Sequence, residues 1–381
     1  MRTLYVALGI WLLTGSAFAQ RHKLASVNAE TPDGKLIQQA LQENDPAKKL
    51  GILEQFIAQF ADKQETTEWV LAQVQPLQLK AGNYDKAIEA GEKLLALDAG
   101  DIDASYGNLK AAEGKKDADA IMKWSAQTSQ IALKIVGEPK KDGEDAEEWK
   151  QAVDYAKQVN TYTEYALYLA ALQSTDPQKV MLLTETLEKR NAESQYIPQL
   201  MERYAASARQ ANAMAKAVEL GERAYARNQF NGDMLLAMSD YFMQQNKLDK
   251  TVTYSTRAVE LMGSQSKPDG FADADWEKKK ASVAGLGNWM SGVALSTQSK
   301  YAPADKALRA ALPNIKENDQ LMATALFHLG LVNYKMGQTS KNKAQIADAI
   351  KFSEQSGAIK GPLQAQALKN VKVIKTEFKI P

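Results

Sequence analysis

The chain has 381 residues, of which 45% are hydrophobic and 24% are charged, with 47 basic against 46 acidic residues. Because it contains no cysteine and only two histidines, a disulfide framework, a thiol nucleophile and the usual zinc sites are excluded. The near-zero net charge also removes the positive surface with which nucleic-acid-binding proteins displace counterions from phosphates. We therefore expect a folded binding protein with no metal, no other cofactor and no nucleic-acid partner.

Residues 1–19 have the pattern of a secretory signal peptide. Arg2 gives a basic start, Leu4–Leu13 form an apolar run, and Ala17-Phe18-Ala19 matches the small-residue cleavage site. The apolar run is well short of the roughly 20 residues that a membrane-spanning helix needs. We expect cleavage before Gln20, export to the periplasm and no membrane insertion of the mature chain. No asparagine falls in an Asn-x-Ser/Thr sequon, which fits a bacterial periplasm.

The remainder of the chain has the periodicity of helices. Residues 20–34 form a polar leader, expected to be disordered, in which His22 is expected to have no specific role. From residue 35 onward apolar residues recur every three or four positions, and β-branched residues nowhere alternate with polar ones over the length of a strand. Asp45-Pro46 and Asp176-Pro177 each combine an N-cap acceptor with a proline at the first helical position. The predicted fold class is all-α.

Segments rich in glycine, proline, serine and charge interrupt this pattern and are predicted to be loops. They lie at 137–145 and 263–275, with a shorter one at Gly337–Lys343. They divide the helical sequence into three groups of hairpins, at 35–136, 146–262 and 276–381.

Internal repeats indicate that these helices come in pairs. The segment AIEAGEKLLA from Ala87 returns as AVELGERAYA from Ala217, and the two Asp-Pro starts show a similar spacing of about 130 residues. A shorter period of 34 residues separates Ala217 from Thr251. A period of this length is typical of one helical hairpin per repeat.

The pattern resembles the tetratricopeptide repeat (TPR) family. The resemblance is carried by KAGNYDKAIEAGEKLLALD (residues 80–98) and LFHLGLVNYKMGQ (residues 326–338), with Gly82 and Gly337 at turns. It implies a TPR-like α-solenoid of roughly nine helical hairpins forming a right-handed superhelix. Two helices of a hairpin approach closely only where side chains are small. The small sites are Ala205, Ser239, Gly292 and Gly330 on first helices, and Ala87, Ala217, Thr251, Ala304 and Ala349 on second helices. Gln75 and Pro76 depart from this pattern, since the first is large and the second should bend its helix.

No residue cluster in the sequence predicts catalysis. His328 has no histidine or carboxylate at the spacing of a metal pair, and the glycines of GLGNWMSG (residues 285–292) follow no strand, so they indicate close helix packing. Tyr162, Tyr165 and Tyr168 recur every three residues, which favours a core position over a ligand platform. We therefore expect that the protein is not an enzyme.

In the TPR-like interpretation, the first helices line a concave groove that accepts an extended or helical peptide. The predicted groove residues are Asp233, Leu236, Asp240, Met243, Trp289, Val293, Phe327, Leu331, Tyr334 and Lys335. The Lys and Asn clamp for a terminal carboxylate is missing at the matching positions, so a hydrophobic or aromatic segment is the expected ligand. Alternatively, Trp289 and Phe327 pack between adjacent hairpins.

The sequence thus predicts an exported, non-catalytic scaffold that binds a protein or peptide segment. The first alternative is a periplasmic small-molecule or glycan-binding protein that uses the aromatic C-terminal groove, for which Asn288-Trp289 is the one hint. The second is an enzyme accessory domain with carboxylate chemistry.

Overall fold

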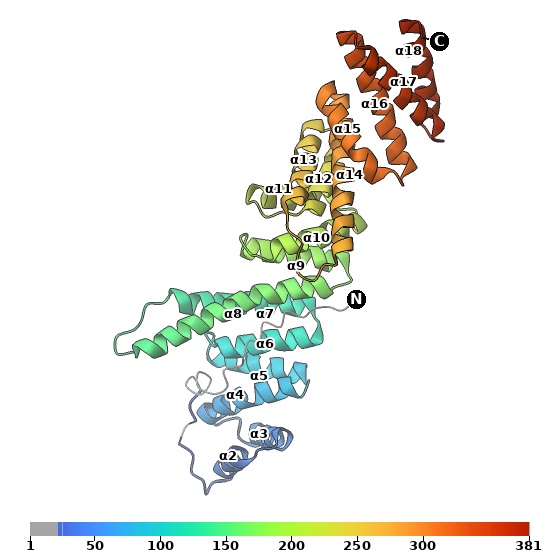
Figure 1. The fold of residues 1–381 in the computed structure, drawn as a ribbon. Helices are drawn as coiled ribbons and strands as arrows, with labels where there is room; N and C mark the ends of the chain where they lie inside the picture. The colour runs from blue at the N-terminus through green and yellow to red at the C-terminus, as the bar shows by residue number, and fades with distance from the viewer. Residues whose placement is uncertain (1–21, 25, 381) are drawn as a thin grey trace. The chain divides into compact units, whose positions relative to one another are not determined.

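The computed structural model describes residues 22–24 and 26–380. The predicted signal peptide, residues 1–19, and the cleavage site before Gln20 lie outside the described residues. Within these residues the chain forms 17 α-helices and no β-strand (Figure 1). The prediction of an all-α fold is therefore confirmed.

The contacts between helices divide the chain into two compact units, and the boundary between them in the sequence lies between Tyr196 and Ile197. The N-terminal unit contains α2 (Pro32–Gln42), α3 (Pro46–Phe60), α4 (Gln64–Lys80), α5 (Tyr84–Leu97), α6 (Ile102–Lys115), α7 (Ala118–Gly137), α8 (Ala146–Gln173) and α9 (Pro177–Arg190). The C-terminal unit contains α10 (Ile197–Gln210), α11 (Met214–Ala226), α12 (Gly232–Gln244), α13 (Leu248–Ser264), α14 (Asp273–Thr297), α15 (Tyr301–Ile315), α16 (Asp319–Ser340), α17 (Lys343–Ala358) and α18 (Gln364–Phe378). The division falls inside residues 146–262, which were predicted to form one group of hairpins.

Within each unit, every helix packs against the helix that follows it in the chain (Figure 1). Even-numbered helices also contact each other, from α4 to α8 in the N-terminal unit and from α10 to α18 in the C-terminal unit. In the described residues, α2 to α17 thus form eight hairpins, close to the roughly nine expected, and α18 follows the last of them. This alternation is that of a TPR-like α-solenoid, while the handedness of a superhelix stays a prediction.

Small residues lie at the crossings within the hairpins, as predicted. In the α12–α13 hairpin, the buried Ser239 hydroxyl donates a hydrogen bond to the carbonyl oxygen of Thr251 over 3.0 Å. In the α16–α17 hairpin, a Cβ atom on Gly330 would lie 2.4 Å from Ser353 Oγ and 3.3 Å from the carbonyl oxygen of Ala349. Real Cβ contacts are longer than 3 Å, so only glycine fits at Gly330 without a shift.

Gln75 shows how one hairpin accommodates a large residue at a position where others have a small one. Its buried amide donates hydrogen bonds to the carbonyl oxygen of Ala104 over 2.9 Å and to Asn108 Oδ1 over 3.0 Å. A Cβ atom on Gly91 of α5 or on Gly107 of α6 would lie 2.3 or 2.6 Å from the Gln75 side chain. The two helices beside α4 therefore accommodate the large Gln75 side chain by having glycine at the positions that contact it.

The helix starts follow the predicted caps. The Asp45 carboxylate accepts hydrogen bonds from the backbone N–H groups of Ala47 and Lys48, and Asp176 caps α9 in the same way. A carboxylate at an N-cap satisfies backbone N–H groups that have no partner within the helix. Pro76 lies inside α4, which continues through it to Lys80.

Two predicted loops lie between helices, whereas the third is mostly helical. Residues 138–145 connect α7 to α8, and residues 265–272 connect α13 to α14. The expectation of a loop over Gly337–Lys343 is wrong for its first half, because α16 continues to Ser340. Gly337 stays helical because α17 packs tightly against it, and a Cβ atom there would lie 2.7 Å from Ile346 Cδ1.

Candidate partner-binding surface

Helix α6 leaves one narrow stripe of its side chains uncovered. Between Ile102 and Glu113 of α6, only Asp103, Tyr106, Lys110 and Glu113 are not buried. Their spacings of three, four and three residues place them on one side of the helix. The neighbouring helices cover the other sides. We call the side of each unit that carries such stripes its even-helix face.

The residues predicted on α12 have the same spacing. Asp233, Leu236 and Met243 are half-buried and Asp240 is exposed. Asp233 is engaged, since Lys279 Nζ of α14 lies 2.6 Å from its carboxylate and 3.4 Å from that of Glu202 on α10. Burial acts to lower the pKa of Lys279, but the two carboxylates outweigh it and raise that pKa. This pairing links the even-numbered helices α10, α12 and α14.

The residues predicted on α14 take part in packing. Trp289 is half-buried against the hydrophobic cluster that joins α14 to α17, and its indole N–H donates to the carbonyl oxygen of Leu321 over 3.1 Å. Val293 is buried in the same cluster, so it does not present a side chain to a ligand. Met243 of α12 packs against this cluster as well.

The residues predicted on α16 fall into separate surroundings. Phe327 is half-buried, with its ring edge against His328. Leu331 and Tyr334 line a small hollow of about 70 Å³ together with residues of α18, and the Tyr334 hydroxyl donates to Glu377 of that helix.

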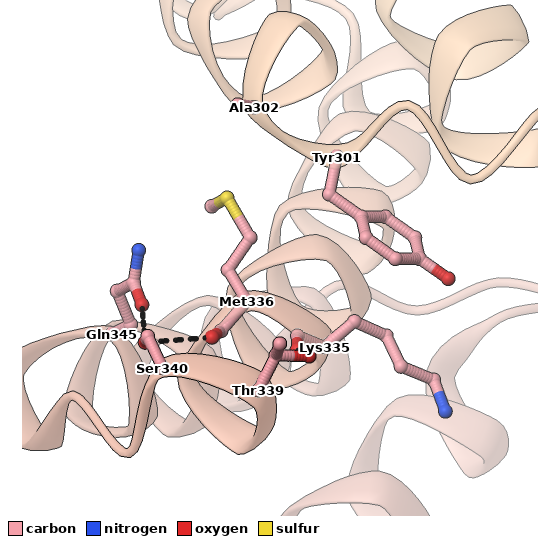
Figure 2. A pocket seen from close by; sticks show the side chains of 7 residues that line it. All are labelled: Tyr301, Ala302, Lys335, Met336, Thr339, Ser340 and Gln345. Atoms are coloured by element: carbon pink, nitrogen blue, oxygen red, sulfur yellow. Dashed lines mark hydrogen bonds between the residues drawn. The ribbon is translucent and has the colours of Figure 1, made fainter.

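Lys335 lies beside a different hollow, of about 410 Å³ (Figure 2). That hollow is also lined by Tyr301, Ala302, Met336, Thr339, Ser340 and Gln345. The ten predicted residues thus lie at the surface of α12, in the packing between α14 and α16, against α18 and beside α15.

An array of tyrosines in the N-terminal unit was not predicted as a site. It consists of Tyr106 of α6, Tyr162, Tyr165 and Tyr168 of α8, and Tyr196 in the turn after α9. All five are half-buried, so the expected core position of the α8 tyrosines is only partly correct. Ring centroids are 5.3 Å apart for Tyr106–Tyr162, 5.8 Å for Tyr162–Tyr165, 5.9 Å for Tyr165–Tyr196 and 4.8 Å for Tyr168–Tyr196. We call these five residues the tyrosine array.

Carboxylates hold the hydroxyl groups at the α6 side of this surface. The Tyr162 hydroxyl lies 2.9 Å from both carboxylate oxygens of Glu113, and Tyr155 donates to Asp103 over 2.7 Å. Burial, together with the Glu113 charge, raises the pKa of Tyr106 to about 12, and the same causes raise the pKa of Tyr162. The phenols therefore remain protonated near neutral pH.

His22 forms a second polar cluster, and the prediction that it lies in a disordered leader without a role is wrong. Its side chain is buried, with Nδ1 2.8 Å from Glu68 of α4 and Nε2 2.8 Å from Asp101, the N-cap of α6. The hydrogen bond to Asp101 is the largest contribution that raises the pKa of His22 to about 8; burial opposes the rise and Glu68 adds to it. His22 thus fastens the segment before α2 to two even-numbered helices.

His328 differs from His22 because no carboxylate compensates for its burial. Its Nδ1 atom is 2.9 Å from Ser296 Oγ, and burial lowers its pKa to about 4. In the part of the chain that the structure describes, no cluster of three His, Cys, Asp or Glu residues could hold a metal ion. Nor does any helix there have the length and apolar character needed to cross a membrane.

No protein-family model matches the sequence, and no curated protein matches it either. Among solved structures, the chain is similar to the TPR domain of P58(IPK), with 11% identity, a TM-score of 0.26, and coverage of 92% of this chain and 99% of that one. It is also similar to yeast Tom70, with 10% identity, a TM-score of 0.23, and coverage of 93% and 97%. The TPR-like fold of the present chain is defined by its own helix alternation and small-residue crossings.

Proposed function

We propose that this protein is a non-catalytic scaffold for protein–protein interaction, exported to the periplasm, which binds an extended segment of a partner on its even-helix faces. TPR-like hairpin arrays suit this role because stacked first helices form a long, continuous surface. The proposal of export depends on the signal-peptide pattern of residues 1–19, and that of a non-catalytic role on the scarcity of nucleophile and acid–base motifs in the sequence.

The observation that supports this proposal best is the uncovered stripe on α6. Neighbouring helices bury the other sides of α6 as far as Glu113, so along this stretch a partner can contact Asp103, Tyr106, Lys110 and Glu113. The spacing is the same on α12. Across the two stripes, Tyr106, Leu236 and Met243 are aromatic or apolar and the other five residues are charged. Such a surface suits a polar interface with a few apolar anchors.

Photo-crosslinking in cells tests the proposal. A photoreactive amino acid would replace Lys110 or Asp240, which lie on the even-helix faces of the two units. Matched controls would replace Leu133 of α7 or Thr253 of α13, which are exposed on odd-numbered helices. We expect a discrete protein adduct from at least one even-helix position and none from the controls.

Two results would contradict the scaffold proposal. Equal adduct formation from all four positions would show nonspecific collisions, and a complete absence of protein adducts would exclude a stable partner on these faces. Fractionation of the same cells checks export, because the protein should appear with periplasmic markers.

A further inference from the structure

The tyrosine array is held rigidly before any ligand binds. Successive rings from Tyr106 to Tyr196 contact each other, and hydroxyl–carboxylate hydrogen bonds fix Tyr162. Asn191, just before the turn that carries Tyr196, donates to Glu164 of α8 over 2.8 Å, which fastens that turn to the helix. A tyrosine with a fixed ring loses little conformational freedom on binding, and this is one reason why tyrosine is enriched at binding hot spots.

The stripe of α6 at the edge of the array carries more negative than positive charge. It contains the carboxylates of Asp103 and Glu113 against one lysine, Lys110. The face of a tyrosine ring is itself the negative side of its quadrupole. This combination complements a positively charged group that can also stack.

At one end of the array, the chain itself already places a cation beside a tyrosine. Lys110 Nζ donates a hydrogen bond to the Tyr162 hydroxyl, lies 4.3 Å from the centroid of that ring and is 3.0 Å from the Glu113 carboxylate. At the other end, no lysine or arginine of the described residues lies over the ring of Tyr165 or Tyr196, which instead pack against each other. The two ends offer similar rings, but only the first is supplied with a cation from this chain.

We infer that the tyrosine array binds an arginine-bearing extended segment of a partner protein, with the guanidinium group stacked on the ring of Tyr165 beside Tyr196, whose own ring is stacked on Tyr168. Arginine fits better than lysine because its planar guanidinium stacks on aromatic faces and gives up its hydration more readily. The inference rests on the proposed scaffold function and names the partner chemistry for the N-terminal unit.

Peptide binding to the mature full-length protein tests this inference. The probe is a fluorescent peptide of glycine, serine and alanine with regularly spaced arginines, and both of its termini are blocked so that they carry no charge. Its binding is followed by fluorescence anisotropy. Two matched peptides carry lysine or citrulline in place of arginine, since citrulline keeps the shape of arginine without its charge. We expect the arginine peptide to bind about tenfold more tightly than the citrulline peptide, with the lysine peptide between them.

Variants locate the binding on the array. The double variant Tyr165→Leu/Tyr196→Leu should weaken arginine-peptide binding by about tenfold, while Tyr165→Phe/Tyr196→Phe should bind like the wild type because the ring faces remain. Tyr301→Leu in the C-terminal unit serves as a control for the loss of a half-buried tyrosine elsewhere. Thermal melting shows whether each variant is folded, and the phenylalanine variant keeps the test valid if the leucine variant is not.

The inference is overturned if the citrulline peptide binds as tightly as the arginine peptide, if no peptide binds, or if both phenylalanine and leucine variants bind like the wild type. Such failure is distinguishable from failure of the scaffold proposal. Adducts from Asp240 or Lys110 in cells would still support a protein partner, which would then be recognised by other chemistry.

Discussion

His22 should make the stability of the N-terminal unit depend on pH in the neutral range. Both ring nitrogens lie 2.8 Å from carboxylate oxygens, so the protonated imidazolium can donate two hydrogen bonds. Because the pKa of His22 is raised from 6.5 to about 8 on folding, the folded state holds its proton more tightly. This stabilisation is fully present below about pH 6.5 and is lost as the pH rises through about 8.

The size of the effect follows from the difference between the two pKa values. The rise from 6.5 to about 8 corresponds to about 2 kcal/mol of unfolding free energy. For a unit of this size, a change of that magnitude lowers the melting temperature by about 4–8 °C.

Thermal unfolding of the mature protein, followed by circular dichroism between pH 6 and 9, measures this loss. His22→Gln should be less stable than the wild type at the low end of the range and should approach it at the high end. Lys23→Gln, a change in the exposed neighbouring residue, should leave the pH profile unchanged. Hydrogen exchange at α4 and α6 would locate the change.

The reasoning about His22 would be refuted by parallel pH profiles of the wild type and His22→Gln. It would also be refuted if the wild type gained stability relative to His22→Gln as the pH rises from about 6.5 to 8, because the sign of the linkage would then be opposite.

Three other predictions follow from packing and from the leader sequence. Gly330→Leu should lower the unfolding free energy by about 1–3 kcal/mol, because even its Cβ atom would lie 2.4 Å from Ser353 Oγ; Gly263→Ala, where nothing lies within 4 Å of the added Cβ, is the matched control in a melting experiment. Gln75→Leu keeps most of the volume but removes two buried hydrogen bonds, and chemical denaturation should show a loss of about 1–3 kcal/mol; an unchanged midpoint would argue against these bonds. The N-terminal sequence of protein purified from the periplasm should begin at Gln20, and an intact residue 1–19 segment on exported protein would contradict the predicted cleavage.

Features encoded by local spacing could be predicted from the sequence. The caps at Asp45 and Asp176 require only a side-chain oxygen next to the first helical turn, so the dipeptide is enough to place them. Ser239 lies 34 residues after Ala205, and Gly330 lies 38 residues after Gly292, so a small side chain at about this spacing reveals both crossings.

Features that depend on a third element could not be predicted in this way. Val293 has groove spacing, yet it is buried because residues of α15 and α16 meet over it. His22 lies in a polar stretch, and nothing in its neighbours indicates that Glu68 and Asp101 lie beside it. Contacts across such sequence distances arise from how successive hairpins stack, which apolar periodicity does not encode.

The tyrosine array was missed for a related reason. The period of 34 residues applied to Gln75 leads to Leu109, so α6 has a large buried residue at the position where other first helices have a small one. The same offsets that select Asp233 and Leu236 on α12 would nevertheless have selected Asp103 and Tyr106. The spacing of the α6 stripe is thus the same as that of α12, but the position from which it is counted is occupied by Leu109 instead of a small residue.

The exchange of volume between Gln75, Gly91 and Gly107 has a consequence for how such chains diverge. Since the Gln75 side chain fills the space that a side chain at 91 or 107 would need, a smaller residue at 75 is tolerated best when 91 or 107 becomes larger at the same time. Selection then acts on the total volume of three positions in three helices, which drift together. A repeat profile that scores columns one at a time penalises every step of such drift, although the stacked hairpins survive it unchanged.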